Sequence, residues 1–443
     1  MGLQLTSSDQ VLALAPDSDS AKNAKALGTT KKWKNLGQNP EALWGECQGS
    51  GKDPYQVRVD LSTLTMTCSC PSRKAPCKHC LGLLLVAVGT PAAVPTAEPP
   101  EWVATWLAKR ATVSKRKETQ AQKAATSESP SAEQKKRAEK RLKQVLKGLD
   151  RLDLWLNDLV RNGLASVETQ PARFWEEQAA QMTDAQAPGM AARLRRMAGI
   201  PDSSPNWSEK LLVQLGRLAL LTHAFRQSEK LDPVLQEDIR QLVGWSLDQE
   251  EVAARGEKVT DDWIILGQRL DDDEKVRAQW TWMVGAQTGR PSLILQFAFG
   301  QTPFKDVFPV GTHQEADLIF YPGAAPQRAQ LEARRGEILP LREPFPGAET
   351  IEAFLASMAA MLARQPWQDR FLCTLRDVIP ICDNQGTKWY MRDSKGDALP
   401  LAKGDHWRML AVSGGMPVDF AGEWDGEVLR PLGVLIDGTY YLL

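Results

Sequence analysis

The chain has 443 residues with 42% hydrophobic and 25% charged residues, and its formal net charge is −1. The composition is ordinary for a soluble globular protein, and the length predicts about three domains. No apolar run approaches the roughly 18 residues of a membrane span. The N-terminus has neither the basic start nor the apolar stretch of a secretory signal. We therefore expect a cytoplasmic protein with no membrane partner.

The small net charge hides an asymmetry between the two ends of the chain. Residues 1–150 contain 23 basic and 14 acidic residues, a formal charge of +9, and the remainder contains 31 and 41, a charge of −10. A basic N-terminal third permits contact with nucleic acid or with an acidic partner. A solvated basic helix explains the same charge, so the asymmetry alone does not decide between them.

The first predicted domain covers residues 1–90 and mixes helices with strands. A short helix is predicted at residues 20–28, where it ends at a glycine. Residues 55–70 predict a hairpin, because Tyr55, Val57 and Val59 alternate and the return strand carries two cysteines. The apolar run after Cys77 predicts a helix that ends near Gly89.

A linker and a helical domain follow. Residues 91–131 are predicted to be a Pro/Ala-rich and polar linker with one short helix near residue 101. The pattern then becomes helical over residues 132–250. In the first of these helices one apolar face is predicted to contain Leu142, Val145, Leu146, Leu149, Leu152, Leu156, Leu159 and Val160.

Residues 255–443 predict a β-rich domain with one helix, at residues 350–365. Period-two patterns separated by Gly and Asp turns indicate short strands in a sandwich or a small barrel, including a hairpin around residues 271–274 and a strand near residues 406–415. The predicted fold class is therefore multidomain α+β, with a small ββα unit, a helical middle domain and a β-rich C-terminal domain.

Five of the eleven cysteine and histidine side chains lie within 13 residues: Cys68, Cys70, Cys77, His79 and Cys80. Seven cysteines, an odd number with most of them clustered, do not resemble a disulfide framework. A tight Cys/His cluster in a reducing compartment is more often a metal site. The scattered Cys47, Cys373 and Cys382 are predicted to be small buried apolar residues.

The spacing within the cluster suits a tetrahedral structural zinc, which needs four Cys or His ligands. Cys68 and Cys70 form one pair, and one-residue spacing on a strand places both side chains on the same face. Cys77 and His79 form the second pair. Cys77 and Cys80 also have a common zinc spacing, since positions i and i+3 share one helical face. A four-cysteine site with His79 turned outward is thus an alternative, and a redox-active Cys77–Cys80 pair is a further one.

The order Cys-x-Cys, spacer, Cys-x-His resembles the SWIM zinc finger, which has a β-β-α scaffold. The resemblance covers roughly residues 30–90 and includes the Trp-Gly strand, Pro54-Tyr55 and the Cys-Ser-Cys-Pro-Ser sequence before Pro-Cys-Lys-His. Residues 182–199 also resemble the region downstream of SWIM in bacterial proteins.

The resemblance implies one structural Zn²⁺ bound by Cys68, Cys70, Cys77 and His79. Cys80 departs from the family pattern, in which a small residue such as Ala is usual, and it stays the alternative ligand. The resemblance also implies a role in binding DNA or protein. Its bacterial relatives are associated with MoxR-type ATPases and von Willebrand A-domain proteins, so a partner of that kind is expected by analogy alone.

No catalytic arrangement stands out, and we expect a protein that is not an enzyme and has no small-molecule substrate. Phosphate-binding glycine motifs and the zinc-protease motif are missing from the sequence. His223 lies in an apolar helix pattern and is predicted to be a core residue, and His313 and His406 are placed in turns or loops without evident partners.

The leading hypothesis is a non-enzymatic, zinc-stabilised interaction protein whose finger docks a protein partner. The alternative is nucleic-acid binding through basic residues of the N-terminal third. The candidate contacts are Lys31, Lys32, Lys34, Arg73, Lys74 and Lys78.

Overall fold

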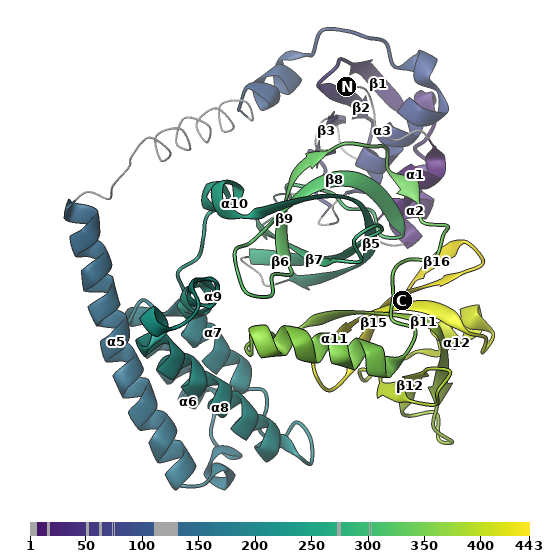
Figure 1. Cartoon of the computed structure of the whole chain (residues 1–443). Coiled ribbons are helices and arrows are strands. Elements are labelled where there is room, and N and C mark those ends of the chain that lie inside the picture. The colour runs from purple at the N-terminus through teal and green to yellow at the C-terminus, as the bar shows by residue number, and fades with distance from the viewer. Residues whose placement is uncertain are drawn as a thin grey trace.

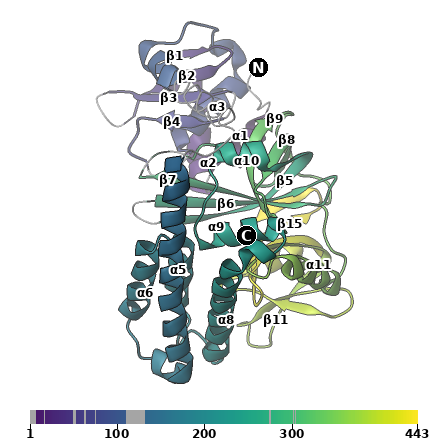
Figure 2. The same cartoon turned by 60° about the vertical axis from the view of Figure 1, so that its left-hand side comes forward.

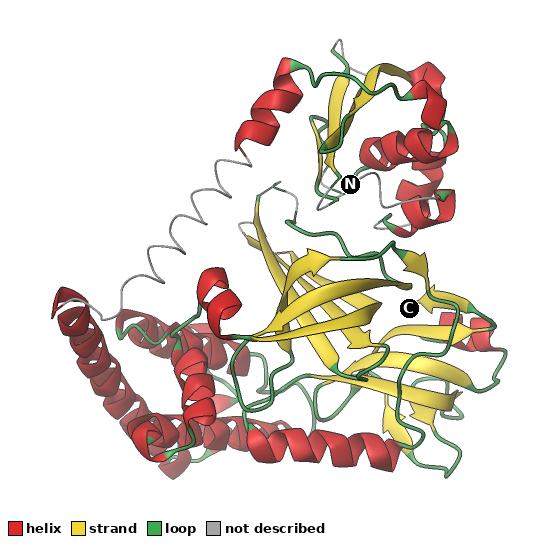
Figure 3. Cartoon of the chain, turned by 45° about the horizontal axis from the view of Figure 1, so that its top comes forward, coloured by secondary structure: helices red, strands yellow, loops and turns green. Residues whose placement is uncertain are grey.

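The chain folds into an N-terminal sheet with helices, a helical bundle and two larger sheets (Figures 1 and 3). This arrangement confirms the predicted α+β class, with a small β unit that contains the Cys/His cluster, a helical middle and a β-rich C-terminal part. The computed structural model describes residues 7–15, 18–49, 53–61, 64–72, 74, 76–109, 132–272, 276–300, 302 and 304–443.

The N-terminal unit is a four-stranded antiparallel sheet packed on one apolar helix. Its strands run in the order β1 (Trp33–Gln38), β2 (Ala42–Cys47), β3 (Tyr55–Asp60), β4 (Met66–Cys68). Helix α3 (Lys78–Gly89) ends where predicted and buries nine of its residues, from His79 to Ala87. Such an all-round apolar helix needs partners on several sides. These are the sheet on one side and the short helices α1 (Ser8–Ala13) and α2 (Ser18–Lys25) on the other.

The segment after residue 90, predicted to be a linker, remains packed on this sheet up to residue 109. Thr96 forms a parallel bridge with Gln38 at the sheet edge. Residues 101–109 are helical, and Val103 packs on Trp44. The Arg58 guanidinium lies over the Trp102 ring at 5.7 Å from its centroid and donates a hydrogen bond to the Trp102 carbonyl oxygen at 3.1 Å. The remaining linker, residues 110–131, lies outside the described residues.

The middle of the chain is a helical bundle with its own core. Val145, Leu149 and Leu152 of the first helix are almost fully buried in it, as predicted. Leu142 and Val160 were assigned to the same face, but they are 44% and 52% exposed because they lie toward the two ends of this long helix. The helices are α5 (Ala132–Arg161), α6 (Ala172–Asp184), α7 (Pro188–Met197), α8 (Trp207–Arg226) and α9 (Pro233–Val243), followed by α10 (Gln249–Arg255).

The first large sheet has six strands in the order β10-β8-β5-β6-β7-β9. β9 pairs with both β7 and β8, so the strands close on themselves around a core that contains Trp263 and Phe320. The predicted hairpin around residues 271–274 is confirmed as β5–β6, and residues 273–275 at its tip lie outside the described residues. The strands are β5 (Glu257–Asp272), β6 (Val276–Gly285), β7 (Pro291–Phe299), β8 (Thr312–Phe320), β9 (Arg328–Arg334) and β10 (Leu339–Pro340).

The second large sheet has the order β13-β12-β11-β14-β15-β16 and packs on the first through a shared apolar layer that includes Trp282 and Leu432. Helix α11 (Ile351–Arg364) contacts β11 and agrees with the predicted helix. The strands are β11 (Phe371–Cys382), β12 (Trp389–Arg392), β13 (Ala398–Pro400), β14 (Val418–Trp424), β15 (Leu429–Ile436) and β16 (Thr439–Leu442).

The strand predicted near residues 406–415 is wrong, because this segment is the short helix α12 (Trp407–Ser413). The Asp405 carboxylate accepts a hydrogen bond from the Trp407 backbone N–H at 3.0 Å, which suits a helix start. Gly414 follows with φ +59°, a left-handed conformation that ends helices and that glycine adopts without strain.

The parts of the molecule meet through specific contacts. Trp367, just before β11, inserts into the bundle core and donates its indole N–H to the Arg217 carbonyl oxygen at 2.9 Å. The first large sheet lies between the N-terminal unit and the second large sheet (Figure 2). At its N-terminal side the Thr65 hydroxyl donates to the Lys305 carbonyl oxygen at 2.6 Å.

Candidate metal centre

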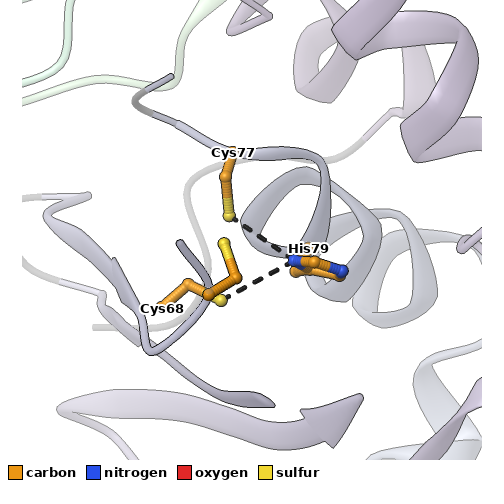
Figure 4. A group of neighbouring side chains, drawn as sticks. Cys68, Cys77 and His79 are labelled. Carbon is orange, nitrogen blue, oxygen red and sulfur yellow. Dashed lines mark hydrogen bonds between the residues drawn. The ribbon is translucent and has the colours of Figure 1, made fainter. Parts of the chain in front are cut away.

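The β4–α3 connection brings three cysteines and one histidine together. Cys68 is the last residue of β4, and Cys70 follows in the loop. The Ser69 backbone N–H donates to the Gln56 carbonyl oxygen at 3.1 Å, so the strand pairing continues between the two cysteines and keeps both on one face. Cys77 is the N-cap residue of α3 and His79 lies in its first turn. Figure 4 shows the side chains of Cys68, Cys77 and His79 converging.

The distances within the cluster fit a tetrahedral zinc. The metal-binding atoms of Cys68, Cys70, Cys77 and His79 all lie within 4.8 Å of one another. His79 Nδ1 is 3.8 Å from Cys68 Sγ and 3.9 Å from Cys77 Sγ. Zinc bonds of about 2.3 Å to sulfur and about 2.0 Å to nitrogen place tetrahedral ligand atoms roughly 3.5–3.8 Å apart. The four groups are therefore compatible with one Zn²⁺, and Nδ1 is the imidazole nitrogen that faces the sulfurs.

Cys80 lies next to this set but is not one of the four mutually close groups. Its Sγ is 3.7 Å from Cys77 Sγ, and its side chain is only 3% exposed. The set of groups that fit one ion contains His79 rather than Cys80. This geometry favours His79 as the fourth ligand and leaves Cys80 as a buried neighbour of Cys77.

Without an ion, the cluster shares protons among its thiols. Hydrogen bonds from Cys68, Cys70 and Cys80 lower the pKa of Cys77, while hydrogen bonds to Cys70 and Cys77 raise the pKa of Cys68. Burial lowers the pKa of His79, but hydrogen bonds to Cys70 and Cys77 outweigh burial and raise it to about 9. Zinc binds thiolates and neutral imidazole, so binding displaces these protons and weakens in acid.

The two ligands on the helix side of the centre are more deeply buried than the two on its strand side. Cys77 and His79 are 4% and 5% exposed, whereas Cys68 and Cys70 are partly buried. The His79 ring packs against Tyr55 of β3, with ring centroids 4.9 Å apart. This contact restrains the orientation of the imidazole, so Tyr55 supports the ligand set from β3.

Two protein-family comparisons match the chain. One is the SWIM zinc finger, over residues 55–87, which include β3, β4, α3 and all four candidate ligands. The chain carries a SWIM zinc finger. The other is the SWIM-associated four-helix bundle domain, over residues 140–243, which lie in the helical bundle from α5 to α9. No curated protein and no solved structure matches the chain.

The SWIM zinc finger thus accounts for the predicted zinc, and the matched bundle accounts for the resemblance noted at residues 182–199. β1 and β2 lie outside the matched finger and widen its two strands into the four-stranded sheet. Within the described residues, no helix is both long enough and apolar enough to cross a membrane.

The described basic residues among the predicted nucleic-acid contacts lie on the protein surface. Burial raises the pKa of the Cys47 thiol, and the positive charges of Lys78 and Lys32 oppose this, so both ammonium groups lie near the end of β2. Arg73 lies outside the described residues. The described candidates, Lys31, Lys32, Lys34, Lys74 and Lys78, are all exposed.

Two histidine predictions outside the SWIM zinc finger are wrong. His223 is exposed rather than buried, because it lies on the solvent side of α8, where it contacts Gln227 at 3.1 Å. His313 lies in strand β8 rather than in a loop, and its Nδ1 is 2.6 Å from an Asp262 carboxylate oxygen. Asp262 pairs with Glu315, so His313 lies two positions further along the adjacent strand, a proximity that sequence spacing does not indicate.

Proposed function

We propose that this chain is a non-enzymatic, zinc-stabilised interaction protein whose SWIM zinc finger docks a protein partner. The observation that carries the proposal is the convergence of four protein ligands on one point. Four protein ligands complete a tetrahedral zinc shell and leave no open position for water or substrate. The ion then holds the β4 loop to the start of α3, and the surrounding surface is free for recognition.

The surface around the ion suits an acidic partner. Lys78 adjoins the ligand Cys77, and both Lys78 and Lys32 act on the Cys47 thiol and are exposed. Complementary charge speeds association and selects partners. By resemblance alone, a MoxR-type ATPase or a von Willebrand A-domain protein is the proposed partner, which predicts an acidic docking face on that protein.

A binding experiment with purified proteins tests the docking role. The zinc-loaded chain should bind a candidate ATPase or A-domain protein, and Cys77→Ser, which removes one ligand, should abolish binding. Cys382→Ser is the matched control because this thiol lies in β11, outside the zinc centre, and it should bind like the wild type. Equal binding by Cys77→Ser and the wild type would reject docking through the finger.

The same pair of lysines supports a second candidate, nucleic-acid binding in the cytoplasm. If phosphates are bound, the affinity for duplex DNA should fall steeply between low and physiological salt. Removal of each phosphate-contacting lysine should then reduce the slope of log affinity against log salt concentration by about one. Lys32→Gln and Lys78→Gln would then each lower the slope. The absence of DNA binding at low salt would eliminate this candidate without affecting the docking proposal.

A further inference from the structure

A pocket of about 450 Å³ opens where the SWIM-associated bundle meets the second large sheet. One wall is formed by α7, the start of α8 and the loop between them, and the opposite wall by Asp369, two residues before β11, and the β14–β15 turn. We call it the bundle–sheet pocket. The residues that an occupant would contact include Arg193, Met197, Ile200, Glu209, Val213 and Asp425.

Most cations of the pocket already have an anionic partner. Arg196 forms an ion pair of 2.8 Å with Asp369, and Lys210 forms one of 2.5 Å with Glu427. Arg193 differs, because the described part of the chain contains no hydrogen bond or ion pair to its guanidinium. Burial and the nearby Arg196 lower the pKa of Arg193 to about 10, so it still carries its charge at neutral pH. Arg193 is only partly buried, so its free guanidinium can exchange water for the acceptor atoms of a ligand.

The rest of the pocket limits what that ligand is. Met197, Ile200 and Val213 provide an apolar wall, and Val213 is 57% exposed although it is apolar. Glu209 and Asp425 also line the pocket, and the Asp425 side chain accepts hydrogen bonds from the backbone N–H groups of Glu427 and Val428 at 2.9 and 2.8 Å. An occupant therefore meets one guanidinium, an apolar surface and two acidic groups.

The charge balance argues against a polyanion. The seven ionisable lining residues are three cations and four carboxylates, so phosphate or a nucleic-acid backbone would meet a net negative pocket. A single carboxylate suits the planar fork of one guanidinium, which can donate two parallel hydrogen bonds to it. The acidic lining residues favour donors or a positive charge further along the same ligand.

We propose that the bundle–sheet pocket binds a free α-carboxylate attached to an apolar residue, with Arg193 receiving the carboxylate. The apolar side chain packs on Met197, Ile200 and Val213, and basic or N–H groups of the preceding residues face Glu209 and Asp425. A peptide C-terminus and a free apolar amino acid share this chemistry. The site does not depend on the zinc finger, so it extends the proposed function without resting on it.

Isothermal titration calorimetry on the full-length, zinc-loaded chain tests the proposal. The probe is acetyl-Lys-Ala-Ala-Leu with a free carboxylate, and its C-terminal amide is the matched ligand control. The free acid should bind, and the amide should bind about tenfold more weakly or worse, since a charge-assisted hydrogen bond contributes roughly 1.5–3 kcal/mol. Free leucine, run in parallel, distinguishes the two sources. Binding of either one through its carboxylate supports the proposal.

Variants at two positions of α7 separate the effect of the pocket from that of its surroundings. Arg193→Met replaces the guanidinium with an unbranched apolar side chain and should weaken binding of the free acid about tenfold or more. Arg193→Lys keeps the positive charge and should keep part of the affinity. Arg195→Met removes an exposed guanidinium that pairs with Glu176 at 2.8 Å outside the pocket, and it should bind like the wild type.

Several results would overturn the assignment. These are no binding of the free acid or leucine to the wild type, equal binding of acid and amide, unchanged affinity in a folded Arg193→Met variant, or tighter binding of inorganic phosphate than of the peptide. If Arg193→Met fails to fold, the affinities of the wild type for the free acid and for the amide still test whether the carboxylate is bound. Melting temperature and zinc content verify that each variant is folded.

Discussion

The SWIM zinc finger and the two large sheets both bury side chains that need a cation beside them, but the cation comes from a different source in each. In the finger, three thiols and an imidazole converge, and the cation that completes the site must come from solution. In the sheets, the chain supplies its own cations. Glu423, 4% exposed, accepts hydrogen bonds from Arg370 and from the Trp282 indole N–H at 2.8 Å. The finger should therefore respond to metal removal, whereas the sheets should respond to loss of single arginines.

Loss of a zinc ligand should have the largest effect. Cys77→Ser should abolish zinc binding and unfold the β4–α3 connection, because a structural zinc contributes on the order of 10 kcal/mol to folding of such a unit. Hydrogen-exchange mass spectrometry should show lost protection in residues 55–87 and unchanged protection in β11, β14 and β15. Lost protection in all of these strands would contradict the independence of the two regions.

Loss of an internal cation should have a smaller effect, confined to the sheets. Arg370→Met leaves Glu423 with the Trp282 indole and with Arg269 at 3.7 Å. We expect destabilisation of about 1–3 kcal/mol, measured by urea denaturation, with full zinc content. Lys395→Met is the control, since its pair with Glu352 is exposed on both sides and should contribute little. A comparable loss in the control would reject the role assigned to Glu423.

On acidification, the finger and the sheets should lose stability at different pH values. The Arg335 hydrogen bonds hold the pKa of Asp317 well below its usual range, so this carboxylate stabilises the fold above its unfolded pKa of about 4 and loses that contribution as the pH falls further. Zinc release, followed with a chelating dye, should begin at higher pH, because thiolates take up protons more readily than this carboxylate does. Asp317→Asn should flatten the stability profile below pH 4 without moving the zinc-release curve. Coincident transitions in the wild type would contradict the comparison.

The smallest effect is expected at Cys80. Cys80→Ser should keep one zinc per chain and lose only the modest stability of a buried thiol, whereas His79→Ala should lose zinc or bind it much more weakly. Zinc content after dialysis measures both variants. Zinc retained in His79→Ala and lost in Cys80→Ser would replace His79 by Cys80 in the ligand set.

Local patterns predicted the finger well because its chemistry is local. Cys68, Cys70, Cys77 and His79 lie within 12 residues, and hairpin and helix periodicity place them without long-range information. His313 and Asp262 meet only through the register of β5 and β8, which the order of residues does not reveal. The bundle–sheet pocket joins Arg193 to Asp369 across two separately folded parts, so no sequence motif could indicate it. The prediction for α12 failed for a different reason, since its N-cap residue His406 makes no capping hydrogen bond and only Gly414 marks an end of the helix.

X-ray absorption spectroscopy of the zinc-loaded chain tests the central claim most directly, because it counts the ligand atoms around the ion. Binding by Cys68, Cys70, Cys77 and His79 predicts three sulfur neighbours at about 2.3 Å and one imidazole nitrogen at about 2.0–2.1 Å. Four sulfur neighbours, or an oxygen neighbour that marks an open position, would contradict the closed three-cysteine, one-histidine site.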